Sequence, residues 1–141
     1  MLYKERVCQA GEKGMGMGYR LLVVDDQKGI RRLLQELFQR EGFEVEVAAD
    51  GMEAIELVKS GVPDVILMDM KMPRMNGLEA SETILKMNQD VAIIMMTAYG
   101  EIEMMKKAVE VGVKKYITKP FDIIVLRDMV KETLARGFQA G

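Results

Sequence analysis

Residues 64–69 read DVILMD, and residues 20–26 read RLLVVDD. Each stretch is a short apolar run that ends in aspartate, which is typical of a buried strand in a parallel sheet. Three similar runs follow along the chain, with amphipathic stretches between them, and this alternation predicts βαβ units. The five predicted strands are 20–24, 43–48, 64–68, 91–96 and 114–118.

The chain length of 141 residues fits one domain with one core. We expect a flexible N-terminal tail over residues 1–18, an α/β domain with a doubly wound parallel sheet over 19–137, and a C-terminal end over 138–141. The run FEVEVA at 43–48 alternates with period two, unlike the other four strands. This alternation indicates a more exposed strand.

Five helices are predicted between and after the strands. The clearest has an apolar stripe formed by Ile30, Leu33, Leu34, Leu37 and Phe38, within residues 30–38. The next two begin at capping boxes, Asp50 with Glu53 and Asn76 with Glu79.

The last two predicted helices are identified by apolar positions at helical spacing. Gly112 is placed to end the first of them in a left-handed cap, and the second ends near Gly137. The apolar positions are Ile102, Met105, Ala108 and Val109 in the former, and Leu126, Met129, Val130 and Leu134 in the latter.

Composition excludes several classes of function. A net charge of −2 gives no support for nucleic-acid binding, and no apolar run approaches the roughly 20 residues that span a bilayer. The single cysteine, Cys8, and the lack of an apolar signal segment fit a reducing cytoplasm. The chain has no histidine, which excludes Ser/His and Cys/His nucleophiles and His-based metal sites.

Polar residues follow the predicted strands at the sheet edge where α/β proteins bind ligands. They are Asp25 and Asp26, then Asp69, Thr97 and Lys119. Three converging carboxylates repel one another and need a cation, and oxygen ligands without His or Cys select Mg²⁺ or Mn²⁺. No glycine-rich phosphate loop follows a strand, which disfavours nucleotide binding.

These residue types suit phosphoryl transfer to a carboxylate. Asp69, at the end of the central strand, is a competent nucleophile toward phosphorus, while Lys119 and Thr97 can stabilise the negative charge that develops. Taken singly, each residue also has a structural interpretation: loop solvation or helix capping for the acid pair, capping for Thr97, and a surface position for Lys119. The Lys119-Pro120 bond is a candidate for the cis isomer.

The ordered set LLVVDDQ, VILMDMKMPRMNG, IIMMTAYG and YITKPF resembles the receiver domain of bacterial two-component response regulators. The resemblance covers residues 19–137 and implies a flavodoxin-like sheet of order 2-1-3-4-5. It implies a Mg²⁺-dependent phosphorylation that moves the surface around residues 102–134 between two arrangements. The implied roles are phosphoacceptor for Asp69, Mg²⁺ ligands for Asp25, Asp26, Asp69 and the Lys71 backbone carbonyl, phosphoryl contacts for Thr97 and Lys119, and aromatic switch for Tyr116.

The resemblance also implies partners. The family takes its phosphoryl group from a phosphohistidine, and since this chain has no histidine, the donor must be another protein. We expect a stand-alone receiver that acts in the cytoplasm with a histidine kinase and a histidine phosphotransferase. DDQKGIRRLL, DMKMP, MTAYGE and KPFDI are especially similar to a sporulation phosphorelay intermediate, although Tyr116 replaces the histidine found there. The implied docking positions are Gln27, Gly29, Ile30, Leu33, Tyr99, Pro120 and Phe121.

Three alternatives remain open from the sequence. A diffusible, chemotaxis-type regulator shares every site residue with a relay intermediate. A phosphohydrolase of the haloacid dehalogenase type uses two aspartates spaced by one residue, whereas Lys71 occupies the second position here. A flavin protein of the same fold does not explain the acidic cluster. We therefore expect a signalling protein rather than an enzyme that turns over small molecules.

Overall fold

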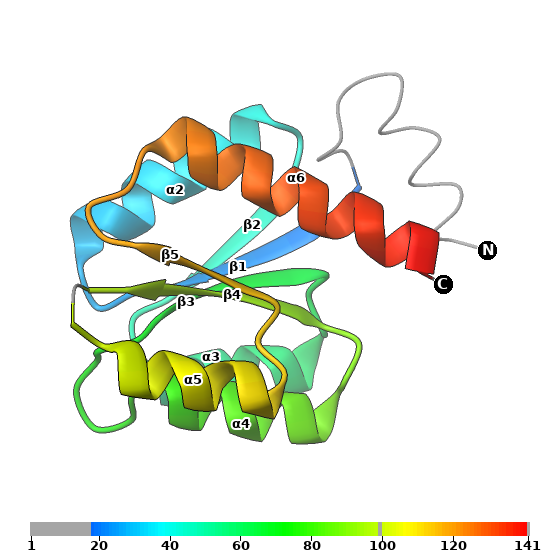
Figure 1. Ribbon diagram of the computed structural model, residues 1–141. Coiled ribbons are helices and arrows are strands. Elements are labelled where there is room, and N and C mark those ends of the chain that lie inside the picture. The colour runs from blue at the N-terminus through cyan, green and yellow to red at the C-terminus, as the bar shows by residue number, and fades with distance from the viewer. Residues whose placement is uncertain (1–17, 99, 141) are drawn as a thin grey trace.

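The computed structural model describes residues 18–98 and 100–140, so all but Gly18 of the predicted tail lies outside the described residues. Five strands and five helices alternate along this part of the chain (Figure 1). In order they are β1 (Arg20–Val24), α2 (Lys28–Arg40), β2 (Glu44–Ala48), α3 (Gly51–Ser60), β3 (Val65–Asp69), α4 (Gly77–Met87), β4 (Ala92–Thr97), α5 (Ile102–Val111), β5 (Lys115–Thr118) and α6 (Ile123–Ala140).

All five strands are parallel, in the order β2-β1-β3-β4-β5, which confirms the predicted sheet. Strand β3 lies between β1 and β4, and every residue in it is buried. The predicted exposure of the FEVEVA segment is also confirmed. Strand β2 is an edge strand in which Glu44 and Glu46 are exposed and Ala48 is buried.

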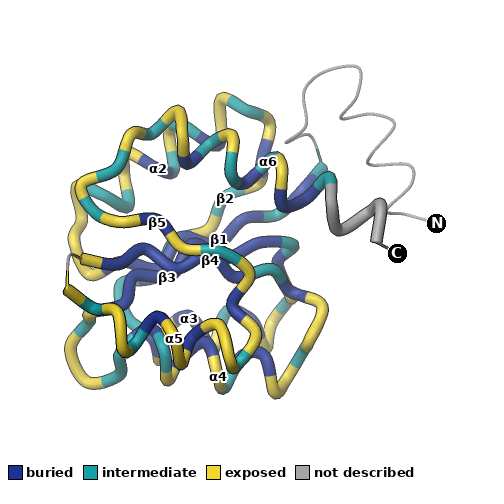
Figure 2. The backbone as a smooth tube through the Cα atoms, in the orientation of Figure 1, coloured by how far each residue is buried: buried dark blue, intermediate teal, exposed yellow. Residues whose placement is uncertain are grey.

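Helices α2 and α6 cover one face of the sheet, and α3, α4 and α5 cover the other (Figure 1). The strands run through the buried interior between these two layers (Figure 2). Side chains of a strand alternate between the faces, so Ile66 and Met68 of β3 pack toward α3, α4 and α5, while Val65 and Leu67 pack toward α2 and α6. The sheet therefore separates two apolar cores, and each stabilises a different set of helices.

Several strand boundaries differ from the prediction by one residue. Strand β3 begins at Val65 and ends at Asp69, because Val65 pairs with Leu21 and Asp69 still pairs with Met96. The other shifts place the strands at Glu44–Ala48, Ala92–Thr97 and Lys115–Thr118, and they follow from the same pairing between neighbours. Asp69 consequently belongs to the hydrogen-bonded sheet and not to the loop after it.

The predicted helix caps are mostly present. Asn76 and Glu79 form a complete capping box at α4. At α3 the Asp50 side chain accepts a hydrogen bond from Glu53 N, but the Glu53 carboxylate accepts one from Ala49 N, so the reciprocal half of the box is absent there. Gly112 ends α5 in the left-handed conformation with φ 115°, as predicted.

Three predictions about helix faces and ends were wrong. Ile102 and Val109 of α5 are 67% and 55% exposed, because the buried positions of this short helix are Met105 and Ala108. Leu33 of α2 is 42% exposed, since Leu34 and Phe38 define the buried side. Helix α6 continues past residue 137 to Ala140, because a single glycine costs a helix only about 1 kcal/mol. None of the described helices is long and apolar enough to cross a membrane.

Candidate phosphoacceptor site

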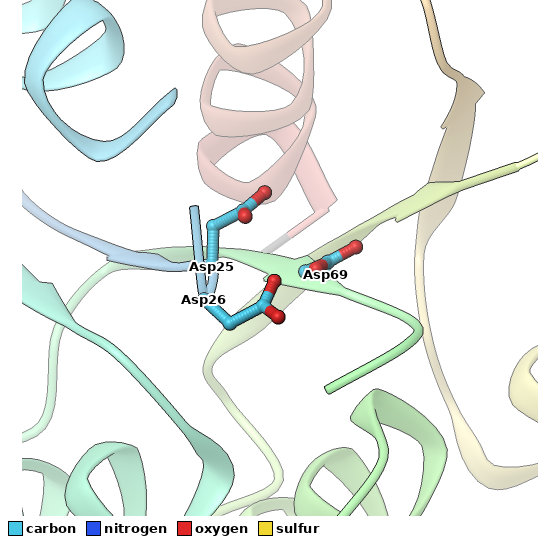
Figure 3. A group of neighbouring side chains, drawn as sticks. All are labelled: Asp25, Asp26 and Asp69. Carbon is cyan, nitrogen blue, oxygen red and sulfur yellow. The ribbon is translucent and has the colours of Figure 1, made fainter. Parts of the chain in front are cut away.

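Three carboxylates meet at the carboxyl ends of β1 and β3 (Figure 3). One carboxylate oxygen from each of Asp25, Asp26 and Asp69 lies within 4.8 Å of the others. Asp25 is fully buried, Asp69 is 5% exposed, and Asp26 is exposed. The predicted convergence of these acids is therefore found, with two buried members and one that solvent reaches.

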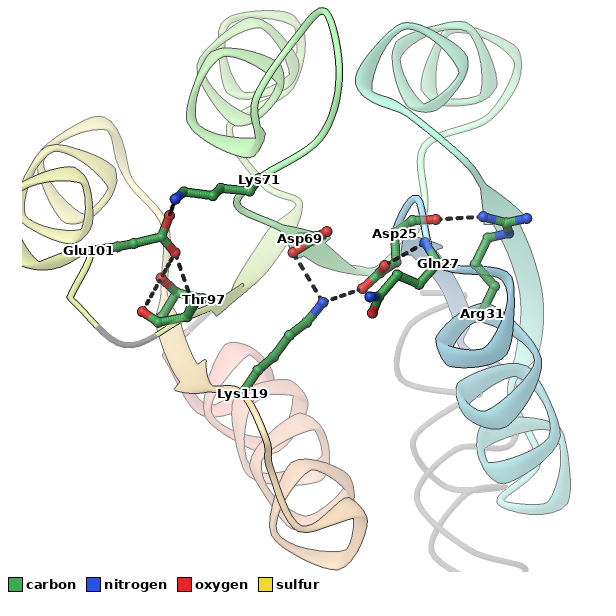
Figure 4. Close-up of polar contacts among 9 residues, drawn as sticks. Asp25, Gln27, Arg31, Asp69, Lys71, Thr97, Glu101 and Lys119 are labelled. Atoms are coloured by element: carbon green, nitrogen blue, oxygen red, sulfur yellow. Dashed lines mark hydrogen bonds and ion pairs between the residues drawn. The ribbon is translucent and has the colours of Figure 1, made fainter.

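The backbone around Asp25 is held from three sides. Its N–H donates to the carbonyl of Ala48 on β2 at 3.1 Å, and its own carbonyl accepts from Arg31 Nη1 of α2 at 2.8 Å. Its Oδ1 accepts from Gln27 N at 2.9 Å (Figure 4). A charge-assisted bond such as that from Arg31 is stronger than one between neutral groups. Arg31 and Ala48 thus hold the backbone of Asp25, and Gln27 N orients its carboxylate. The Arg31 contact was not predicted from the sequence.

Lys119 joins the acid cluster from the end of β5. Its Nζ lies 2.7 Å from Asp25 Oδ2 and 3.2 Å from Asp69 Oδ1, so one ammonium bridges the two buried carboxylates (Figure 4). The backbone N–H of Lys119 donates to the carbonyl of Thr97, which ties β5 to β4 at this point. The Lys119-Pro120 peptide bond is cis. The Lys119 ammonium thus contacts the acid cluster and does not take the surface position that was its structural alternative.

The electrostatics of the cluster are dominated by burial. Burial and the neighbouring Asp25 charge raise the pKa of Asp69 from its ordinary value of 3.8 to about 7, and Lys119 opposes this rise. Burial lowers the pKa of Lys119, but the hydrogen bond to Asp25 and the charge of Asp69 outweigh this effect and raise it. Lys119 is thus protonated, and its single charge contacts two of the three carboxylates in the cluster. An oxygen-only donor set with excess negative charge fits a hard divalent cation.

Thr97 ends β4, but its hydroxyl does not point at the acid cluster as its predicted role requires. Its Oγ1 donates to Glu101 Oε1 at 2.8 Å, and Ala98 N donates to the same oxygen at 2.8 Å. Lys71 Nζ lies 3.6 Å from Glu101 Oε2. Burial raises the pKa of Glu101, but the bonds from Ala98 and Thr97 and the charge of Lys71 outweigh it and lower that pKa. No role was predicted for Glu101 from the sequence, although it lies within MTAYGE.

Gly77 begins α4 where the helix meets the end of β3. Its N–H donates to the carbonyl of Met70 at 2.7 Å, and a Cβ at this position would lie 2.2 Å from the carbonyl oxygen of Asp69. No side chain fits so close to a backbone. Gly77 was likewise not predicted from the sequence, where its only signal was its place after the capping residue Asn76.

A cavity of about 410 Å³ adjoins the acid cluster on the side of α4 and α5. It begins at Asp26, the exposed member of the cluster. Its lining combines this carboxylate and Lys71 with apolar side chains, so the cluster is approached through a partly apolar opening. The lining residues are Asp26, Lys71, Met72, Pro73, Asn76 and Met104.

The predicted switch and docking residues vary in exposure. The Tyr116 side chain on β5 is 52% exposed. Ile30 and Phe121 are partly buried against the core under α2 and α6, so both serve the fold and keep only part of their surface free. Tyr99 lies outside the described residues. The remaining predicted docking residues, Gln27, Gly29, Leu33 and Pro120, are exposed.

Residues 21–131 match the response regulator receiver domain family, and the chain belongs to this family. The five-stranded fold and the strand-end acids agree with this class.

The chain is also similar to individual proteins with receiver domains. The chain is 42% identical over 118 residues to sporulation initiation phosphotransferase F of Bacillus subtilis, covering 84% of this chain and 95% of that protein. It is 39% identical over 116 residues to the chemotaxis protein CheY of Treponema pallidum, covering 80% and 81%. A CheY-like receiver domain structure from Methanospirillum hungatei superposes with a TM-score of 0.84 at 31% identity, covering 87% of this chain and 98% of that one.

Proposed function

We propose that this protein is a signalling switch that accepts a phosphoryl group on Asp69 from a phosphohistidine of a partner protein. The observation that carries the proposal is the bridge from Lys119 Nζ to Asp69 Oδ1 and Asp25 Oδ2 inside a three-carboxylate cluster. It brings a nucleophile, a fixed positive charge and an acidic donor set to one strand-end site.

The transfer uses groups of this chain in distinct roles. A carboxylate oxygen of Asp69 attacks phosphorus, the phosphorus–nitrogen bond to the donor imidazole breaks, and that nitrogen keeps the electron pair. Lys119 Nζ, 3.2 Å from Asp69 Oδ1, is placed to attract an oxygen of the incoming group. The Thr97 hydroxyl can donate to a phosphoryl oxygen only after its hydrogen bond to Glu101 Oε1 breaks.

Mg²⁺, or Mn²⁺, fits the donor set of this site. Asp25, Asp26 and Asp69 would hold the ion through carboxylate oxygens, with the backbone carbonyl of Lys71 as a further ligand. When bound, the ion supplies positive charge that offsets the negative charge on the phosphoryl oxygens. Asp26 is the exposed member and borders the cavity, so it is the carboxylate of the cluster that solvent reaches.

We further propose that the protein works as a phosphorelay intermediate in the cytoplasm, without turnover of small molecules. Its partners are then a histidine kinase and a histidine phosphotransferase, and neither nucleic acid nor membrane is involved. The 42% identity to a sporulation initiation phosphotransferase over 95% of that protein supports this role. The exposed Gln27, Gly29 and Leu33 on and beside α2 suit a docking partner next to the acid cluster.

A second candidate is a diffusible regulator that binds its target directly. The 39% identity to a chemotaxis protein over 81% of its length favours it, as does the exposed apolar surface at Ile102, Val109 and Tyr116. In this case Tyr116 acts as the aromatic switch, and its outward position is the one expected before phosphorylation.

The central test is labelling by a phosphohistidine protein that carries isotopic phosphate. We expect one label per chain, and its formation should depend on Mg²⁺ and be prevented by a chelator added beforehand. Asp69→Asn should abolish it, whereas Asp90→Asn, a change at an exposed aspartate before β4, should not. Full labelling of Asp69→Asn would contradict the assignment of the acceptor.

A chase of the labelled protein separates the candidate roles. Transfer of the label to a second histidine protein supports the relay, whereas stable binding of a target without transfer supports the diffusible regulator. Catalytic hydrolysis of small phosphate esters would contradict both.

A further inference from the structure

Glu101 directs its side chain back toward the end of β4 and not along its own helix. It occupies the residue before α5, where a side chain commonly caps the first turn, yet it makes no such cap hydrogen bond. Its side chain is only 7% exposed. Glu101, Thr97 and Lys71 form a group on one side of Asp69, Asp25 lies on the other side, and the Lys119 ammonium reaches between Asp69 and Asp25 (Figure 4).

The two oxygens of Glu101 are used unequally. Oε1 accepts hydrogen bonds from Thr97 Oγ1 and Ala98 N, both at 2.8 Å. Oε2 is buried, has no hydrogen-bond partner among the described residues, and lies 3.6 Å from Lys71 Nζ. Burying a carboxylate oxygen without a hydrogen bond costs free energy, so this arrangement is poor as a device for stability alone.

This carboxylate engages two donors beside the phosphoacceptor. A hydroxyl has one proton, and the proton of Thr97 that would bind a phosphoryl oxygen is directed at Glu101 instead. The ammonium of Lys71 is drawn to the same carboxylate. For Thr97 to contact a phosphoryl group, its bond to Glu101 must break.

We propose that Glu101 is a positioning residue that holds Thr97 in the arrangement of the unphosphorylated protein and competes with the phosphoryl group for the Thr97 hydroxyl. This inference rests on the proposed function of Asp69. It makes Glu101 a determinant of how strongly phosphorylation shifts the switch, because a ligand shifts an equilibrium only by its differential affinity for the two states. Removing the competitor should favour the phosphorylated arrangement.

The test is the equilibrium affinity for beryllofluoride, an analogue of the phosphoryl group on aspartate, measured by calorimetry at saturating Mg²⁺. Glu101→Gln keeps the shape but is a weaker acceptor, so we expect binding to tighten by about 3- to 10-fold. Glu101→Ala should tighten it at least as much. Glu103→Gln, a change at an exposed glutamate in the first turn of α5, is the matched control and should leave the affinity unchanged.

A second comparison identifies the group through which Glu101 acts. In a Thr97→Ala background the Glu101→Gln change should have no effect on beryllofluoride affinity, because the donor for which the two acceptors compete is gone. A merely structural role predicts the opposite sign in the parent protein, since a damaged loop binds the analogue more weakly.

These measurements distinguish failure of the Glu101 inference from failure of the proposed function. If the unaltered protein with Mg²⁺ does not bind beryllofluoride, the assignment of Asp69 is wrong. If it binds, and Glu101→Gln binds equally well or more weakly, competition by Glu101 is wrong. Should Glu101→Ala fail to fold, the near-isosteric Glu101→Gln still decides the question.

Discussion

The site has two walls that are organised differently. The Lys119 wall consists of Asp25, Asp69 and Lys119, and its donor points at the reacting carboxylate at 3.2 Å. The Glu101 wall consists of Thr97, Lys71 and Glu101, and its donors point away from that carboxylate. In the proposed phosphorylation, one half of the site would therefore be in place before the phosphoryl group arrives, and the other half would have to rearrange.

The physical difference lies in what holds each wall. Lys119 contacts two carboxylates whose side chains are 0% and 8% exposed. Asp69 ends β3, and Asp25 directly follows β1. Glu101 belongs to the β4–α5 connection, and its ion-pair partner Lys71 is 75% exposed. Ion pairs with an exposed member contribute little stability, so the Glu101 wall is the less costly one to rearrange.

The largest expected effect is at the Lys119 wall. Lys119→Met removes the ammonium and keeps a side chain of similar length, and we expect labelling by a phosphohistidine donor at saturating Mg²⁺ to slow by about 100-fold or more. The affinity for Mg²⁺ should not weaken, because the competing cation between Asp25 and Asp69 is lost. Lys106→Met on the surface of α5 is the control. Labelling within tenfold of the parent would show that the bridge is not needed.

A second prediction tests the support under Asp69. Gly77→Ala places a Cβ 2.2 Å from the Asp69 carbonyl oxygen, and we expect the free energy of unfolding to fall by about 2–4 kcal/mol. Gly29→Ala is the matched control, since a Cβ there has nothing within 4 Å and the residue lies in α2. That change should be neutral or stabilising by up to about 1 kcal/mol. Urea unfolding of both variants measures the difference, and equal values would contradict the close approach.

A third prediction concerns pH. Because the pKa of Asp69 rises from 3.8 to about 7, the folded metal-free protein binds this proton more tightly than the unfolded chain does. The stabilisation is full below pH 3.8 and is lost as pH rises through about 7. Relative to Asp69→Asn, the parent protein in chelator should lose on the order of 2 kcal/mol between about pH 5 and pH 8.

Adding Mg²⁺ at about pH 8 should stabilise the parent more than Asp69→Asn, since the ion favours the charged carboxylate. Urea unfolding with and without the ion measures this. A constant stability difference between the two proteins across the pH range would contradict the assignment of the raised pKa to Asp69.

The smallest effect is expected from Lys71→Ala. The backbone carbonyl stays, and the lost ion pair has an ammonium that is 75% exposed, so the free energy of unfolding should change by less than about 0.5 kcal/mol. Labelling should stay within about threefold of the parent. A loss as large as that of Lys119→Met would mean that the two walls do not differ as described.

The strand order followed from the resemblance to receiver domains. The acid cluster followed from the residues themselves, because parallel strands bring their carboxyl ends to one edge, where Asp25, Asp69 and Lys119 were expected to meet. The exposure of the edge strand β2 was predicted correctly because its apolar and charged residues alternate with a period of two. The boundaries of β3 were wrong by one residue because they depend on pairing with Leu21 and Met96, which the sequence of one strand does not contain.

Other features could not be predicted because they depend on how side chains and helices are oriented in the folded protein. Glu101 is a glutamate at the start of a helix, and nothing local distinguishes capping from a bond to Thr97 four residues earlier. The spacing of Ile102 and Val109 predicted a helix correctly. Their exposure could not be predicted, because the position of α5 on the sheet decides how much of the helix surface is covered. The hydrogen bond from Arg31 to the Asp25 carbonyl could not be predicted for the same reason, because it depends on how α2 packs beside the end of β1.

The separation of the two cores by the sheet bears on how many molecules the protein can communicate with at once. Helix α2 packs into one core and α5 into the other, and the sheet lies between them. A change in the β4–α5 connection therefore requires repacking on one side only, while the surface beside α2 keeps its shape. A phosphoryl donor bound next to α2 and a target protein bound on α5 need not exclude each other. Phosphorylation and target binding can therefore overlap in time.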